Sequence, residues 1–190
     1  MSLDVGTGDG RLPYALGQHS PRRLFIGIDA SAAGLRELSG RAAREGLANV
    51  VYVRAGVEQL PAQLAGVADR VTVILPWGSL LGAVALPAVP VLARLRALCQ
   101  AEASLTVVLS LGERDRAEAA RLGLPPIDEA HLHGDLAAGY SFAGFTLTSV
   151  RSLDREELAR WPSTWARRLA HGRPRPVFHL TARAGLAPLS

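Results

Sequence analysis

Short apolar runs alternate with longer amphipathic stretches along the first half of the chain. Four such runs, rich in β-branched residues, occupy 24–28, 50–53, 71–75 and 105–109. Each is followed by enough residues for a helix, which predicts a β-α-β-α order and a largely parallel, doubly wound sheet. Because such crossovers are right-handed, the first strand lies near the centre of the sheet. We also expect a helix from Ser31, as its cap, to about Glu45.

The last two strand-like segments alternate apolar with polar residues, over 145–150 and 177–182. Alternation is typical of antiparallel strands that have one uncovered face, so we expect both near an edge of the sheet. Between them the sequence predicts a polar helix over about 154–160, followed by an arginine-rich linker. An amphipathic region with a break at Pro125-Pro126 occupies 112–139.

Length and composition are those of one globular domain. A chain of 190 residues with 48% hydrophobic and 20% charged residues can bury a core of its own. No apolar run reaches the roughly 20 residues of a membrane span, so we expect no membrane partner. We see no signal peptide, and the single cysteine, Cys99, suits a reducing cytoplasm and is expected to pack in the core.

Basic charge is concentrated in the C-terminal part of the chain. All 21 basic residues are arginine, and the net charge is +4. From Leu158 onward there are six arginines and no aspartate or glutamate. An acid-free arginine cluster favours contact with phosphate, most plausibly that of a nucleic acid, and a solvated basic tail is the alternative.

The stretch DVGTGDGR, which begins at Asp4, predicts a tight turn between the first strand and its helix. Gly6, Gly8 and Gly10 permit the turn and let a ligand approach the backbone, while the next helix offers free N–H groups. The spacing differs from the G-x-G-x-x-G pattern of dinucleotide sites. A carboxylate at Asp4 would repel a pyrophosphate and attract the ammonium group of S-adenosylmethionine.

Two carboxylates follow the next two strands at positions that suit a nucleoside. Asp29 ends the second strand, about twenty residues after the glycine turn, where a carboxylate can accept hydrogen bonds from both ribose hydroxyls. Glu58 follows the third strand and can accept a hydrogen bond from an adenine amine. An exposed residue at a helix start is an equal alternative for Glu58.

Two tryptophans lie in motifs that suit a planar substrate. Trp77, in LPWGSLL, follows the fourth strand at the sheet edge where ligands bind, with core packing as the alternative. Trp165, in STWARRL, lies among arginines, and the two rings could sandwich one flipped base. Trp161 is expected to pack a helix end. Leu75 replaces the Asn or Asp that methyltransferases acting on adenine amino groups carry here, which disfavours that chemistry.

These motifs resemble the 16S rRNA methyltransferases that modify N1 of a decoding-site adenine and confer kanamycin–apramycin resistance. The resemblance rests on DVGTGDGR, Asp29, AGVEQLP, LPWGSLL and STWARRL, and covers nearly the whole chain. It implies a class I, Rossmann-like S-adenosylmethionine-dependent fold with seven strands, the last antiparallel, in one domain over 1–190. It further implies an RNA-contacting linker at about 152–176 and a cytoplasmic monomer that acts on 16S rRNA in the 30S subunit.

The resemblance also assigns roles to individual residues. The residues implied to bind S-adenosylmethionine are Asp4, Gly6, Gly8, Asp29, Ala30, Val57, Glu58, Leu75 and Ser79. Trp77 and Trp165 are implied to stack on the target adenine. The RNA contacts implied are those of Arg168, Arg173 and Arg175.

The predicted chemistry is methyl transfer without a general base. Adenine N1 has its own lone pair, so catalysis rests mostly on positioning. His131 and His133 lack a third ligand nearby, and we expect no metal.

One departure from the family concerns the start of the chain. Members usually have an N-terminal hairpin and a full first strand, whereas only Met1-Ser2-Leu3 precede Asp4. Either the start is truncated or this member lacks the extension, which bears on cofactor affinity, stability and RNA docking. The alternatives are methylation of another rRNA base, such as guanine N7, or of a small molecule, and an inactive protein that binds cofactor or RNA.

Overall fold

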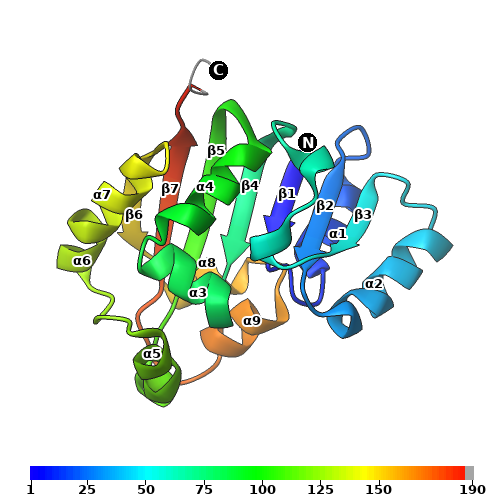
Figure 1. Ribbon diagram of the computed structural model, residues 1–190. Coiled ribbons are helices and arrows are strands. Elements are labelled where there is room, and N and C mark those ends of the chain that lie inside the picture. Colours follow the sequence, from blue (N-terminus) through cyan, green and yellow to red (C-terminus); the bar gives the residue numbers. More distant parts are fainter. Residues whose placement is uncertain (187–190) are drawn as a thin grey trace.

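A seven-stranded sheet with helices on both faces forms the centre of the protein in a computed structural model that describes residues 1–186 (Figure 1). The strands are β1 (Ser2–Val5), β2 (Phe25–Asp29), β3 (Val50–Arg54), β4 (Ala68–Ile74), β5 (Cys99–Leu109), β6 (Phe145–Ser152) and β7 (Phe178–Ala184). Their spatial order is β3-β2-β1-β4-β5-β7-β6. The first five are parallel, and β7 is antiparallel to both of its neighbours.

This topology confirms the predicted α/β doubly wound sheet, its central first strand and its antiparallel last strand. β6 is the outer strand at one end, and β7 is inserted between β5 and β6. β6 runs in the same direction as β5, so its antiparallel character comes only from its pairing with β7. The last four residues of the predicted domain, 187–190, lie outside the described residues.

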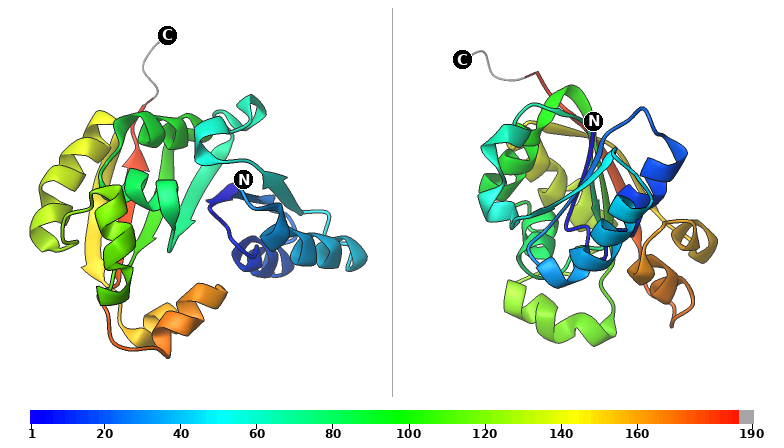
Figure 2. Two further views of the ribbon diagram at one scale, coloured as in Figure 1. Left: turned by 60° about the horizontal axis from the view of Figure 1, so that its bottom comes forward. Right: turned by 90° about the vertical axis from the view of Figure 1, so that its right-hand side faces the viewer.

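Nine helices and three short 3-10 turns connect the strands within residues 1–186. The helices are α1 (Arg11–His19), α2 (Ala32–Arg44), α3 (Gly78–Ala85), α4 (Val89–Leu98), α5 (Arg116–Leu122), α6 (Glu129–His133), α7 (Asp135–Phe142), α8 (Arg155–Ala159) and α9 (Thr164–Ala170). The 3-10 turns are η1 (Val57–Gln59), η2 (Ala62–Leu64) and η3 (Glu113–Asp115). Figure 2 shows α1 and the α8–α9 segment on the face of the sheet opposite to α3 and α4.

Three hydrophobic clusters within residues 1–186 hold the helices, and one of them packs Tyr14 of α1 and Leu38 of α2 on Val50. The largest one packs α3, α4 and α7 on the sheet residues that alternation turns toward them, such as Leu3, Val71 and Leu105, all fully buried. A smaller cluster packs α8 and α9 on Val108, whose side chain lies on the other face of β5. The α8–α9 segment, which carries the arginine-rich motif, is therefore anchored to the sheet.

Several local predictions can be compared with the structure. Ser31 does occupy the N-cap of α2, but its side chain makes no capping bond; its backbone N–H donates to Asp29 instead, at 2.8 Å. Cys99 is buried, as predicted, and burial raises its pKa to about 11. Trp161 is half-buried and packs beside α8 and α9, as expected for a helix-end residue.

In the described part of the chain, no single helix is long and apolar enough to cross a membrane. α3 and α4 are long and apolar enough only when taken together, and they are bent by 97° at their junction.

Candidate functional site

The glycine turn after β1 has a backbone that only glycine adopts easily. Gly6, Gly8 and Gly10 have φ values of 74°, 60° and 74°, in the left-handed region. A Cβ on Gly6 would lie 2.5 Å from Leu80 Cδ2, so this position also lacks space for a side chain. The turn is thus fixed by conformation and by packing from α3.

Asp29, at the end of β2, holds this turn with its carboxylate. Its Oδ2 accepts a hydrogen bond from the Gly8 N–H at 2.8 Å, and its Oδ1 accepts from the Ser31 N–H at 2.8 Å. A carboxylate has about four lone-pair sites, so both oxygens retain capacity for ligand hydroxyls. Asp29 therefore orders the two loops that flank it and still presents acceptors to the space between them.

A cavity of about 520 Å³ lies at the carboxyl ends of β1 to β4, at the lower edge of the sheet in Figure 1. Eight of the nine predicted cofactor residues line it: Gly6, Gly8, Asp29, Ala30, Val57, Glu58, Leu75 and Ser79. Glu58 is exposed in η1 and also lines the cavity. The two alternatives for this residue, an exposed position at a helix start and a contact with a ligand, therefore do not exclude each other. The volume falls within the range of small-molecule sites.

Asp4 is the exception among the predicted cofactor residues. It lies beneath the glycine turn, is 6% exposed and does not line the cavity. Burial raises its pKa from an ordinary 3.8 to about 6, and the Thr72 hydroxyl, which donates to Asp4 Oδ1 at 2.6 Å, partly offsets that shift. Asp4 is thus a desolvated carboxyl that lies behind the residues lining the cavity.

A strained turn after β4 presents Trp77 to solvent. Leu75 has a φ of 50°, which costs a residue with a side chain about 1–3 kcal/mol. Gly78, the first residue of α3, has a φ of 60°, so Pro76-Trp77 lies between two residues in the left-handed region. Trp77 is 59% exposed, and the alternative that it packs in the core is wrong.

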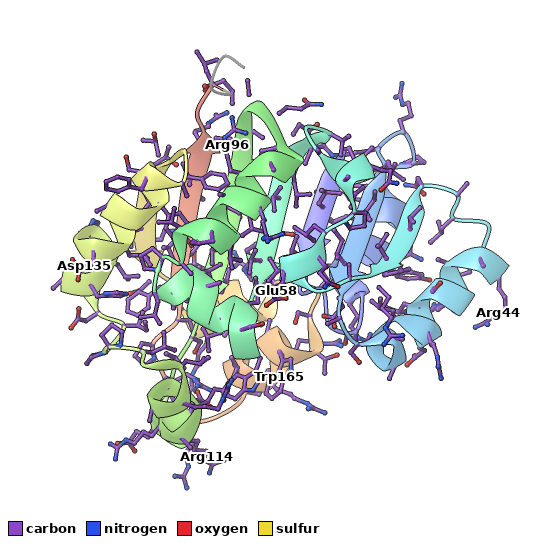
Figure 3. All side chains as sticks on the ribbon, in the orientation of Figure 1. Arg44, Glu58, Arg96, Arg114, Asp135 and Trp165 are labelled. Carbon is purple, nitrogen blue, oxygen red and sulfur yellow. The ribbon has the colours of Figure 1, made fainter. Side chains whose placement is uncertain are left out.

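A second cavity, of about 280 Å³, adjoins the first. The two share Leu75, Pro76, Trp77 and Trp165 as lining residues. Trp165 projects from the start of α9 and is 60% exposed. Figure 3 shows Trp165 and Glu58, which are far apart in the sequence, at the same edge of the sheet. Both tryptophans thus border the cavity at the strand ends and the one next to it.

The three predicted RNA-contacting arginines have different environments. Arg168 is exposed, and its guanidinium lies 5.7 Å from the centre of the Trp165 ring. Arg173 is exposed. Arg175 is only 19% exposed, forms an ion pair with Asp115 and lines the second cavity. Arg175 therefore faces the space beside the tryptophans, whereas Arg168 and Arg173 face solvent.

Three site residues were not identified from the sequence. Asp9 and Thr164 line the first cavity and are hydrogen-bonded to each other. Both lie inside motifs that the sequence singled out, GTGDG and STW, so their neighbourhood was the signal. Asp115 lies in a polar stretch with no motif, and only the fold brings it to Arg175.

The polar groups that line the first cavity fit S-adenosylmethionine. Two carboxylates, Asp29 and Glu58, can accept from hydroxyl and amine groups, and the exposed backbone of the glycine turn leaves room for a close approach. In the described part of the chain, no group of three or more His, Cys, Asp or Glu side chains is arranged to hold a metal ion.

Comparison with known proteins matches this arrangement to one family. The model of the family described as NpmA: 16S rRNA (adenine(1408)-N(1))-methyltransferase matches residues 1–184. A relative named 16S rRNA (adenine(1408)-N(1))-methyltransferase, from Escherichia coli, is 35% identical over 95% of this chain and 85% of its own length. A relative of the same name from Streptoalloteichus hindustanus is 37% identical, over 95% of this chain and 86% of its own.

Solved structures agree with the sequence relatives. The aminoglycoside resistance methyltransferase NpmB1 is 39% identical, with a TM-score of 0.82 over 96% of this chain and 86% of its own. A mutant 16S rRNA (adenine(1408)-N(1))-methyltransferase from Catenulisporales acidiphilia, solved with cosubstrate SAM, has a TM-score of 0.88 and 33% identity. That match covers all of this chain and 87% of the other.

Proposed function

Because the chain belongs to the 16S rRNA (adenine(1408)-N(1))-methyltransferase family, we propose that it modifies adenine 1408 within the assembled 30S subunit. The protein is an S-adenosylmethionine-dependent enzyme that methylates N1 of this adenine and confers aminoglycoside resistance. We further propose that it acts as a monomer in the cytoplasm, where its ribosomal substrate is found, and that one domain carries both cofactor and RNA sites.

The observation that carries this proposal is the shared wall of the two cavities. Methyl transfer needs the donor and the target base at one point, with the reacting atoms about 3–3.5 Å apart. The first cavity has the carboxylates and glycine turn of a nucleoside site, and the second has exposed aromatic rings and Arg175. Because Trp77 and Trp165 line both, a base stacked on them would lie at the mouth of the cofactor site.

The cofactor side supplies hydrogen-bond acceptors and a fixed backbone. We assign Asp29 to the ribose hydroxyls and Glu58 to the adenine amine of the cofactor, since both carboxylates line the cavity. Ala30 and Val57 are the neighbouring wall residues, Gly6 and Gly8 also line the cavity, and a Cβ on Gly8 would meet nothing within 4 Å. Asp4, beneath the turn, supports the methionine ammonium as a buried negative charge when it is ionised.

The base side positions adenine for direct attack. When bound, S-adenosylmethionine supplies a sulfonium methyl group, which N1 can accept with its own lone pair. No residue has to remove a proton from N1, so the residues around the base need only hold it and exclude water. Trp77 and Trp165 hold its faces, and Arg175, fixed by Asp115, contributes positive charge beside it.

The linker over 152–176 is our proposed RNA-contacting surface. It contains α8 and α9, which the small cluster on Val108 anchors to the sheet. Arg168 and Arg173 are exposed on it and can contact phosphates, which fixes the register of the enzyme on the RNA. A folded subunit offers such contacts at defined distances, which is why we favour the 30S particle over free RNA.

Methyl transfer from labelled S-adenosylmethionine to purified 30S subunits, followed by primer extension, tests this proposal. We expect a strong stop at adenine 1408, because a methyl group on N1 blocks base pairing. Protein-free 16S rRNA should be a much poorer substrate. Equal methylation of free rRNA would contradict recognition of the assembled subunit, and label without a stop would mean that another atom or base is modified.

A further inference from the structure

A hydrogen bond joins the glycine turn directly to the helix that carries Trp165. The Thr164 hydroxyl donates to Asp9 Oδ2 at 2.5 Å, across 155 positions of sequence. Asp9 lies between Gly8 and Gly10 in the turn, and Thr164 is the first residue of α9. This contact is therefore a direct polar link between the cofactor side and the base side.

Asp9 is a fixed anchor for this link. Its Oδ2 also accepts from Arg11 Nε at 3.0 Å, and its Oδ1 accepts from the Arg11 backbone N–H at 3.3 Å. The glycine next to it is held by Asp29 through the Gly8 N–H. The Asp9 carboxylate is consequently oriented by the start of α1 before Thr164 reaches it.

The position of Trp165, in contrast, depends on few other contacts. Its ring is 60% exposed, and it belongs to neither of the clusters that form the cores around α3 and α8. The buried residues of α9 are Ala166 and Ala170, and the partly buried Leu169 packs against the same small cluster. The N-cap bond from the Ala166 N–H to Ser163 Oγ is long, at 3.4 Å. Packing thus holds one face of α9 on the sheet, and the Thr164–Asp9 bond adds a polar contact at the end of the helix that carries Trp165.

We propose that Thr164 is a positioning residue, which fixes the rotation of α9 through Asp9 and thereby sets Trp165 opposite Trp77 at the mouth of the cofactor site. The link acts on the base side through a group that the glycine turn already holds. It rests on the proposed function for its effect on catalysis. Its effect on the position of Trp165 is a property of the protein alone.

Thr164→Val tests the proposal, because valine keeps the shape of threonine and removes the donor. We expect a lower kcat for 30S methylation, by about tenfold for loss of one hydrogen bond to a charged group, with an unchanged Kd for S-adenosylmethionine. Thr164→Ser retains a hydroxyl and should restore most of the kcat. Thr148→Val removes a threonine hydroxyl on β6 that bonds to Thr181 on β7, away from both cavities, and it should leave the kcat unchanged.

A measurement without RNA separates this proposal from the function it rests on. In a background with Trp77→Phe and Trp161→Phe, Trp165 is the remaining tryptophan. Thr164→Val should lower its fluorescence anisotropy and increase its quenching by acrylamide, and Thr164→Ser should not. Unchanged anisotropy and kcat in Thr164→Val would overturn the proposal, as would an equal loss in Thr164→Ser. Failure of the wild type to methylate 30S subunits would overturn the proposed function, while the anisotropy would still decide the role of Thr164.

Discussion

The proposed cofactor side of the site is built mainly from backbone groups, whereas the proposed base side is built from side chains. The cofactor side uses backbone: three left-handed glycines, and a carboxylate that accepts two N–H bonds. The base side uses side chains: two tryptophans about 60% exposed, on a strained turn and at the start of a seven-residue helix. Substitutions in the glycine turn should therefore alter the shape of the whole turn. Substitutions of the tryptophans should reduce methylation by smaller amounts and leave the rest of the site unchanged.

Gly6→Ala should have the largest effect, because it distorts the backbone of the glycine turn on the proposed cofactor side. The left-handed φ costs alanine about 1–2 kcal/mol, and the new Cβ would lie 2.5 Å from Leu80 Cδ2. We expect the affinity for S-adenosylmethionine, measured by calorimetry, to fall by about 100-fold or more, at a cost on the order of 3 kcal/mol.

Gly8→Ala is the matched control for this comparison. Gly8 has a similar φ of 60°, but a Cβ there would meet nothing within 4 Å. It should therefore show the conformational cost alone, with a much smaller loss of affinity. Equal losses in the two variants would mean that packing against Leu80 contributes nothing to the shape of the turn.

Asp4→Asn should give the next largest effect and separate stability from binding. The folded pKa of about 6 lies above the ordinary 3.8, so the folded protein holds the proton more tightly than the unfolded chain. The free energy of unfolding therefore falls as pH rises from about 4 to about 6, and it stays lower above that. At pH 7, Asp4→Asn should raise it, on the order of 2–3 kcal/mol, while weakening cofactor binding.

Urea unfolding at pH 4.5 and pH 7, with calorimetry of cofactor binding, checks this prediction. The stabilisation should shrink at the lower pH, where the wild-type carboxyl is largely protonated. The same stabilisation at both pH values would contradict the assignment of a desolvated, titrating Asp4.

Trp77→Ala and Trp165→Ala should reduce methylation without affecting the cofactor side. Loss of stacking on one base is worth about 1–3 kcal/mol, so kcat/KM for 30S subunits should fall roughly fivefold to 150-fold in each. The Kd for S-adenosylmethionine should stay close to that of the wild type. Methylation unchanged by Trp165→Ala would exclude the sandwich, and Trp161→Phe provides a control for tryptophan loss in the core.

Arg173→Ala should have the smallest effect and sharpen the contrast among the arginines. Arg173 is exposed, and no acidic side chain within residues 1–186 pairs with it. Its loss should weaken 30S binding modestly and make the plot of log K against log salt about one unit less steep. Arg175→Ala should instead lower the thermal stability, because it leaves the largely buried Asp115 without its ion-pair partner. Equal salt slopes in Arg173→Ala and wild type would remove Arg173 from the RNA surface.

The gathering of the glycine turn and Asp29 at one cavity could be predicted from the sequence, because the signals for it are local. Glycines need left-handed φ values within one turn, and Asp29 follows its own strand, so neighbouring residues determine both. The parallel topology then brings the strand ends together. The position of Trp77 at this edge could be predicted for the same reason, since adjacent residues determine its turn.

The remaining features depend on distant contacts that no local pattern contains. The pairs Asp9–Thr164 and Arg175–Asp115 form only when α9 and η3 dock below the sheet. The burial of Asp4 follows from Thr72 on the adjacent strand and from the turn above it. β7 likewise pairs with β5 and β6, and the alternation of polar and apolar residues does not specify which strands are its neighbours.

The place of β7 also has a consequence for the order in which the enzyme is completed during synthesis. The five parallel strands are all present once residue 109 has emerged, and they can form the β3-β2-β1-β4-β5 part of the sheet. β6 has no partner until β7 arrives, since β7 lies between it and β5. Synthesis delivers the chain from its N-terminus at about 5–20 residues per second, so β5 emerges several seconds before β7. We therefore expect the edge of β5 to stay open, and the first cavity to lack the wall formed by residues 163–165, until the C-terminal part of the chain has emerged.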